Sequence, residues 1–164
     1  MDQNTVINFS KFKTRQSSLS EFERLKLMDY MGKSQPIVMT YLMAATESLK
    51  SQTARKTLFD LGLTLLMTVS ENKNNIIEYT TLDGHNKKNI RLFESVLKSD
   101  NNHLIDSSIA IVNELPDSEL LLMIIESLKE WTRAESQFKK NYYTMMLIYL
   151  KTIIDCFAEK EVQI

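Results

Sequence analysis

The chain has 164 residues, of which 43% are hydrophobic and 25% are charged, and its formal net charge at pH 7 is −1. This length suits one domain with a buried core, and the balanced charge excludes a global field that recruits nucleic acid or an anionic membrane. A single cysteine, Cys156, excludes an intrachain disulfide. Without a signal-peptide core or a long apolar run, we expect a cytoplasmic protein that does not enter a membrane.

Glycine and proline are scarce, with three and two copies in the whole chain. A sheet protein of this size needs many tight turns, which usually draw on Gly, Pro, Asn or Asp. The intervals between Gly32, Pro36, Gly84 and Pro116 are instead the length of helices. We therefore expect an all-α fold over residues 18–160, a compact single-domain bundle of about six or seven helices that ends in a long apolar helical hairpin.

Residues 1–17 are polar and show no periodicity that supports a helix or a strand. They carry Lys11, Lys13 and Arg15 against a single acid, Asp2. We expect a flexible basic N-terminal arm, and the alternative is an arm that contacts phosphate groups.

Two helices are predicted between about residues 18 and 50. Capping boxes at Ser18 and Ser20 predict the start of the first helix. Gly32 sits where a left-handed C-terminal stop belongs, and Pro36 suits the first turn of the second helix. The predicted buried stripes are Phe22, Leu25, Leu27 and Met28 in the first helix, and Val38, Leu42, Ala45 and Leu49 in the second.

The run from Leu27 to Val38 resembles the middle of a DNA-binding helix-turn-helix, in which a short helix ends in glycine, a polar turn follows and a second helix enters the major groove. The run departs from the motif at Met28, where a small residue is usual, and at Lys33, where an apolar anchor is usual. An ordinary helical hairpin uses the same Gly and Pro punctuation, so both interpretations stay open. The predicted reading face is Gln35, Met39 and Thr40, which offers no Arg or Lys to guanine.

A third helix is predicted over about residues 53–71. Its core stripe recurs at helical spacing, and further apolar residues widen the stripe, which predicts a neighbouring helix on each side. Gly62 lies inside this helix, where we expect a close crossing with another helix; a ligand contact is the alternative. The stripe is Ala54, Leu58, Leu61, Leu65 and Val69, widened by Phe59, Leu63, Leu66 and Met67.

Residues 72–89 are ambiguous. Residues 76–82 are rich in β-branched side chains, and Asp83-Gly84 is a hairpin turn signal. The residues that follow make a poor second strand, so we expect a short helix over 76–82 or an ordered loop, with a strand as the alternative.

A fourth helix is predicted over roughly residues 86–98, with Ile90, Phe93 and Leu97 buried. It places three basic side chains in the first turns, where the helix dipole disfavours positive charge. Such a local conflict sometimes marks a binding surface, and a solvated face is the alternative. The three basic residues are Lys87, Lys88 and Arg91.

A fifth helix, capped by Asp100 or Asn101 and ended by Pro116, is predicted next. Its predicted stripe is Leu104, Ile105, Ile109, Val112 and Leu115.

The stretch 117–158 holds the densest apolar run and contains neither Gly nor Pro. One continuous helix of this length would jut out of a domain of this size, so we expect a break between about 134 and 141 and two helices packed as a hairpin. Its apolar residues exceed what one buried face needs, which predicts a self-association interface. The candidate interface residues are Trp131, Phe138, Tyr142, Met145, Met146 and Tyr149.

The sequence carries no recognisable catalytic constellation. It lacks a glycine-rich phosphate loop, and His85 and His103 have no partner at metal-ligand spacing. We therefore expect no enzyme activity, no cofactor and no metal. The expected function is that of a small interaction or regulatory protein that self-associates, with a protein or a second copy as partner. The alternative is a nucleic-acid-binding regulator that uses residues 20–50 together with the basic arm or the basic residues of the fourth helix.

Overall fold

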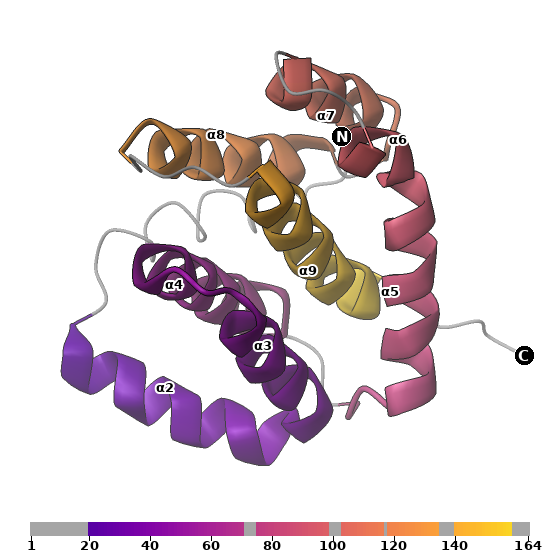
Figure 1. Cartoon of the computed structure of the whole chain (residues 1–164). Coiled ribbons are helices and arrows are strands. Elements are labelled where there is room, and N and C mark those ends of the chain that lie inside the picture. The colour runs from indigo at the N-terminus through magenta and orange to yellow at the C-terminus, as the bar shows by residue number, and fades with distance from the viewer. Residues whose placement is uncertain (1–19, 71–74, 99–102, 117, 135–139, 159–164) are drawn as a thin grey trace, which may run out of the picture.

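Helices are the only regular elements in the part of the chain that the computed structural model describes, which is residues 20–70, 75–98, 103–116, 118–134 and 140–158 (Figure 1). The all-α prediction is therefore confirmed over these residues. The helices are α2 (Glu21–Ser34), α3 (Pro36–Ser48), α4 (Gln52–Ser70), α5 (Tyr79–Leu92), α6 (Glu94–Lys98), α7 (Leu104–Asn113), α8 (Ser118–Ala134) and α9 (Lys140–Ala158).

The last of these helices, α9, lies at the centre of the bundle (Figure 1). It packs most extensively against α4 and α5, and less extensively against α8, α3 and α6. Its side chains are buried around most of the helix, including Tyr143, Leu147, Leu150 and Ile153. A helix that is apolar on most sides is stable only inside a protein core, which explains its central place.

Helices α8 and α9 pack against each other, so residues 118–134 and 140–158 do not form one straight helix. The predicted break between about 134 and 141 falls largely on residues 135–139, which lie outside the described residues. The predicted hairpin is not confirmed as the main packing, because α9 makes its larger contacts with α4 and α5. Helix α9, the second half of this apolar stretch, is therefore the helix with the most neighbours in the bundle. Helix α8 packs against α7 as well as α9.

Helix α2 begins at a capping box, as predicted. The backbone N–H of Glu23 donates to Ser20 Oγ at 3.2 Å, and the backbone N–H of Ser20 donates to Glu23 Oε2 at 3.1 Å. The predicted glycine stop is wrong, because α2 continues through Gly32 to Ser34 and no described residue has a positive φ. Pro36 occupies the first turn of α3 as expected.

The predicted buried stripe of α2 is wrong in its first half. Phe22 and Leu25 are 65% and 60% exposed, whereas Met31 is buried. Each residue of a helix turns it by about 100°, so Met31 lies about 180° from Phe22 around the axis. Because α2 lies at the edge of the bundle and packs mainly against α3 and α4, only one of its sides can be buried.

The crossing of α3 and α4 confirms the prediction made for Gly62. A Cβ built on Gly62 would collide with Cδ1 of Leu42 and lie 3.0 Å from its Cδ2, so the glycine permits the close approach. The predicted stripe of α3 is buried in full, and that of α4 is buried except for the half-buried Val69.

Helix α5 decides between the alternatives for residues 76–89. The expected short helix over 76–82 is confirmed in part, because residues 79–82 are helical, and the strand alternative is wrong. The helix passes straight through Asp83-Gly84, so neither the hairpin turn nor a strand is present there. Lys87 Nζ lies 2.8 Å from Asp83 Oδ2 one turn away, an ion pair that suits a helix better than a turn.

The helix predicted over 86–98 is divided between α5 and α6 by a turn at Phe93. Phe93 is fully buried as predicted, but Ile90 is 43% exposed, which corrects that part of the stripe. In α7, Leu104 and Val112 are buried and Ile105, Ile109 and Leu115 are partly buried. The predicted caps of that helix, Asp100 and Asn101, lie outside the described residues.

Candidate functional site

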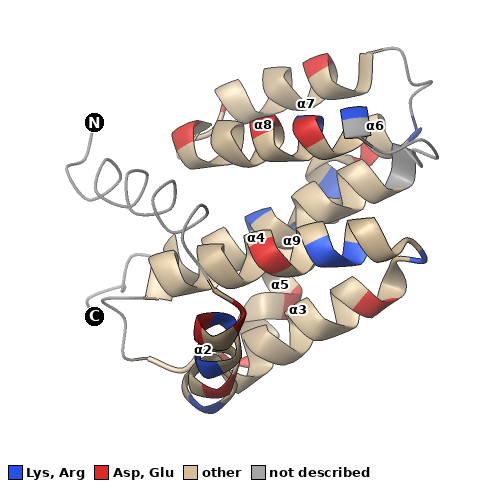
Figure 2. Cartoon of the chain, turned by 90° about the vertical axis from the view of Figure 1, so that its left-hand side faces the viewer, with Lys and Arg blue, Asp and Glu red and all other residues tan. Residues whose placement is uncertain are grey.

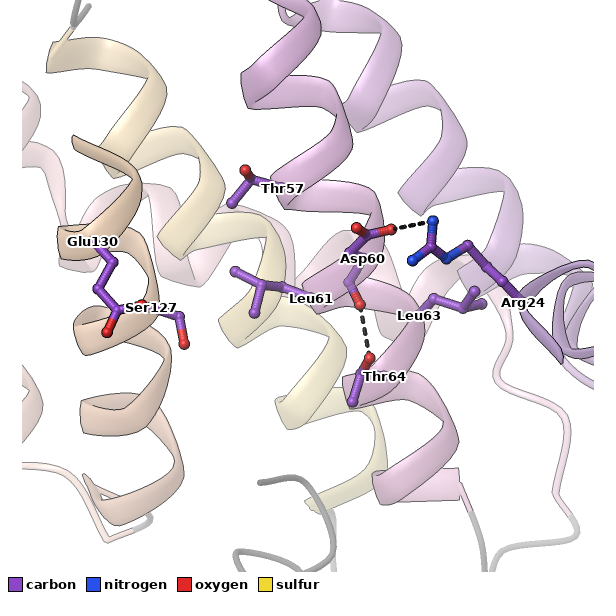
Figure 3. Close-up of a pocket in the computed structure, with 8 residues that line it drawn as sticks. All are labelled: Arg24, Thr57, Asp60, Leu61, Leu63, Thr64, Ser127 and Glu130. Atoms are coloured by element: carbon purple, nitrogen blue, oxygen red, sulfur yellow. Dashed lines mark hydrogen bonds and ion pairs between the residues drawn. The ribbon is translucent and has the colours of Figure 1, made fainter. Parts of the chain in front are cut away.

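A groove of about 240 Å³ opens between α4 and α8, with α2 beside it (Figure 3). Its lining mixes hydroxyl groups, carboxylates and leucines, so it combines polar and apolar surface. The lining residues are Arg24 from α2, Thr57, Asp60, Leu61, Leu63 and Thr64 from α4, and Ser127 and Glu130 from α8.

Asp60 is the charged centre of this groove. Arg24 Nη1 lies 3.3 Å from Asp60 Oδ1, and both side chains are about one third exposed. Burial raises the pKa of Asp60, while the positive charges of Arg24 and Lys56 act in the opposite direction. The lining contains neither histidine nor cysteine. The groove is therefore equipped to hold a polar group by hydrogen bonds and charge.

A second polar feature joins α3, α5 and α9, and we call it the polar seam. Asn89 on α5 donates through Nδ2 to Thr152 Oγ1 at 3.1 Å and to Asp155 Oδ2 at 2.9 Å. Lys151 Nζ donates to the same Asp155 oxygen at 2.6 Å. The seam is made of Tyr41, Asn86, Asn89, Lys151, Thr152 and Asp155, with the Tyr41 hydroxyl donating to Asn86 Oδ1 at 2.7 Å.

The polar seam is buried at its centre, and Tyr41, Asn86 and Asp155 are partly buried. Asn89 and Thr152 have no exposed surface, and Lys151 is 7% exposed. Asn89 Oδ1 has no hydrogen-bond partner in the described part of the chain. Burying an acceptor without a hydrogen-bond partner costs free energy, so this acceptor lowers the stability of the contact between α5 and α9. Burial also raises the pKa of Tyr41 well above its ordinary value, which keeps this phenol neutral.

The predicted DNA-reading face is mostly buried. Gln35 is 3% exposed, and its side chain donates to the Asn75 carbonyl at 2.9 Å and accepts from the Ile77 N–H at 3.0 Å. Met39 is 4% exposed, so Thr40 is the exposed member of the three. The reading role predicted for Gln35 is therefore corrected to a structural one, in which it attaches the segment before α5 to the α2–α3 junction.

The predicted basic residues do not gather around that face. Lys33 is exposed and pairs with Asp29 at 3.0 Å. Lys87, Lys88 and Arg91 are exposed in the second half of α5, so the predicted conflict with the dipole at the helix start is wrong. Arg91 lies in the last turn, where the dipole favours a cation. Lys11, Lys13 and Arg15 lie outside the described residues.

The candidate interface residues of α8 and α9 are largely engaged within the chain. Trp131 and Met146 are buried, and Tyr142, Met145 and Tyr149 are partly buried. Tyr142 Oη accepts from the Lys50 N–H at 3.1 Å, and the Tyr149 ring meets the Tyr41 ring edge-on with centroids 5.7 Å apart. The stretch has more apolar residues than one buried helix face needs, but α9 buries them on several faces because it has neighbours on several sides. Phe138 lies outside the described residues.

The large apolar side chains that are exposed include Tyr30, Met43, Ile76, Tyr79 and Ile90. Two more lie on the outward side of α2. Phe22 and Leu25 lie there, and Lys26 Nζ sits 4.5 Å from the centroid of the Phe22 ring. Residues of both charge signs occur along this helix (Figure 2). We call Glu21, Phe22, Leu25 and Lys26 the outward α2 face.

Sequence reasoning missed the polar seam. Asn89 is three residues after Asn86 and four before Phe93, a spacing that places all three on one side of a helix. The helix predicted over 86–98 already contained all three residues, but its buried stripe was assigned to Ile90, Phe93 and Leu97, which left Asn86 and Asn89 out. Asn, Thr, Lys and Asp are also ordinary surface residues, and nothing local marks them as buried.

No family model, curated protein or solved structure matches the chain. Among the described residues, no group of three or more His, Cys, Asp or Glu side chains is arranged to hold a metal ion. Within those residues there is also no helix with the length and apolar character needed to cross a membrane.

Proposed function

We propose that this chain is a non-enzymatic helical interaction protein that self-associates through the outward α2 face. The observation that carries the proposal is the exposure of Phe22 and Leu25, at 65% and 60%, on a helix whose opposite side already packs on the bundle. Leaving two large apolar side chains in water forgoes about 1.5–3 kcal/mol each, which a partner can recover.

The chemistry of the outward α2 face favours a second copy as the partner. Phe22 and Leu25 are spaced as the a and d positions of a coiled coil, and Glu21 and Lys26 then occupy the flanking g and e positions. In a parallel pair, a g residue meets the e residue five positions further along the other helix. Glu21 of one copy therefore meets Lys26 of the second copy, and the two-fold symmetry forms this ion pair twice.

The pairing is expected to be weak. Asp29 follows at the next a position, which ends the apolar contact after two turns. A contact of this length buries far less than the roughly 1,200 Å² of a stable interface. We therefore expect a monomer–dimer equilibrium that depends on concentration.

Sedimentation velocity across a wide concentration range tests the proposal. The mean mass should rise with concentration, and F22S/L25S should remain a monomer. The matched control is I90S, which removes another partly exposed apolar side chain, from α5, and should behave as the unmodified chain. A mass that stays monomeric for the unmodified chain at every concentration contradicts the proposal.

A charge swap tests the parallel arrangement separately. E21K should weaken the dimer by placing like charges together, and E21K/K26E should restore it because the pair is inverted. If the double variant is no better than E21K, the copies do not pair in this register.

Nucleic-acid binding is the second candidate function, and α5 supports it best. Lys87, Lys88 and Arg91 are exposed together along the second half of this helix, and Gly84 beside them has open space around it. Titration of labelled duplex DNA at low and near-physiological salt is the test, with K87E/K88E/R91E as the variant. Binding that falls steeply with salt and is abolished in this variant supports the second candidate.

A further inference from the structure

Helix α5 is attached to the bundle by few apolar side chains. Within its bounds, Leu82 is buried and Leu92 is partly buried, and the fully buried Phe93 follows at its C-terminal end. By contrast, α4 buries Leu58, Leu61, Leu63, Leu65 and Leu66. Tyr79 and Ile90 on α5 are exposed. Apolar burial is the main force that holds helices together, so α5 has less of it than its neighbour on the other side of α9.

Polar groups make up a large part of the attachment. Asn86 accepts from Tyr41, Asn89 donates to Thr152 and Asp155, and Gln35 binds the backbone just before the helix. Water can replace each of these hydrogen bonds when the helix separates, so each contributes little to net stability. The unpartnered Asn89 Oδ1 even gains a partner when water reaches it.

We propose that α5 is a latch, a helix that separates from α9 as a unit while α3, α4 and α9 stay folded. Proteins open in cooperative segments, and the segments that open first are those with little buried apolar contact. This inference is independent of the outward α2 face, which lies on another helix.

Opening of the latch uncovers one side of α9 that contains a chemical reporter. Thr152, the acceptor for Asn89, and Cys156 are four residues apart and so lie on the same side of the helix. Cys156 is 3% exposed and is the single cysteine of the chain. Its reaction with a thiol reagent therefore reports when this side of α9 meets solvent.

The test compares the rate at which 5,5′-dithiobis(2-nitrobenzoate) labels Cys156 with the free energy of global unfolding in urea. In the unmodified chain, the labelling rate should change little at low urea, because separation of one helix exposes little surface. N89A should raise the labelling rate at least about tenfold, since it leaves Thr152 and Asp155 without the Asn89 donor while α5 stays packed, which disfavours the packed state. The matched control is L65A on α4, which lowers global stability and should leave labelling in the absence of urea unchanged.

Hydrogen exchange on the unmodified chain keeps the test independent of any variant. The amides of α5 should exchange together, at an opening free energy below that of α4 and α9. The latch is overturned if the α5 amides exchange only with those of α4, or if labelling follows global unfolding and L65A accelerates it as much as N89A does.

Discussion

Helix α9 is held in two different ways by its two largest neighbours. On one flank, α4 presents a row of leucines, and five of them are buried. On the other flank, α5 presents Asn89, whose amide reaches Thr152 and Asp155. The comparison shows that two helices can pack closely without a mainly apolar contact. We infer that the α4 contact contributes most of the stability of α9, whereas the α5 contact fixes the register of α5 against α9.

The difference has a physical origin. Apolar contacts are non-directional, so leucines stabilise α4 over a range of small displacements. Hydrogen bonds between buried groups are directional, and a displaced Asn89 would leave several of them unmade at once. The α5 flank therefore contributes less free energy and specifies the register more sharply.

The largest expected effect comes from the apolar flank. Leu65→Ala should reduce the free energy of unfolding by about 2–5 kcal/mol, because it removes a fully buried side chain and leaves a cavity. Urea denaturation followed by circular dichroism measures the change. Ile90→Ala, at an exposed site on α5, is the control and should stay near zero. A loss below about 1 kcal/mol for Leu65→Ala would mean that α4 is not the main source of stability.

The next effect tests the charged part of the polar flank. Asp155→Leu should cost about 3 kcal/mol, because Lys151, whose side chain is 8% exposed, loses its carboxylate partner. Lys151→Met/Asp155→Leu should recover most of that loss, since neither charge then remains buried. The free energies come from the same urea experiment, and a double variant no more stable than Asp155→Leu would show that the unpaired Lys151 charge carries no penalty.

A smaller change in the free energy of unfolding is expected at the apolar crossing of α3 and α4. Gly62→Ala should destabilise by about 1–2 kcal/mol, because the new methyl group meets buried Leu42 and this outweighs the better helix propensity of alanine. Leu42→Val removes both δ-methyl carbons that would be struck. The two substitutions should therefore be less costly together than the sum of their separate effects, and simple additivity would contradict the close contact.

The smallest effect at neutral pH concerns Tyr41 in the polar seam. Its pKa is raised in the folded state, so the stability it contributes is complete below the unfolded value of about 10 and is lost as the pH rises above that value. Burial also raises the pKa of Tyr143, to about 12, with the same sign. Unfolding free energies measured from neutral pH to about pH 11 should fall above pH 10, and less steeply in Tyr41→Phe. An unchanged slope in that variant would place the Tyr41 hydroxyl in water.

Local patterns in the sequence are enough to predict most of the helices, although the full extent of α5 and its division from α6 were not predicted. The scarcity of Gly and Pro, the capping box at Ser20, the proline at the start of α3 and the leucine spacing of α4 all depend on neighbours within one or two turns. Gly62 is informative for the same reason, because a glycine inside a helix has a cost that a close crossing explains. These parts of the fold could be predicted because their causes are local.

Only the tertiary structure decided which sides of the helices are buried and what α9 contacts. The outward α2 face and the buried stripe of α4 look alike as patterns, but α2 lies at the edge and has neighbours on one side only. The polar seam could not be predicted from the sequence either, because Asn89 and Asp155 are 66 residues apart and neither is apolar. Burial of a polar residue depends on a partner that the chain brings from elsewhere, and no local spacing records that partner.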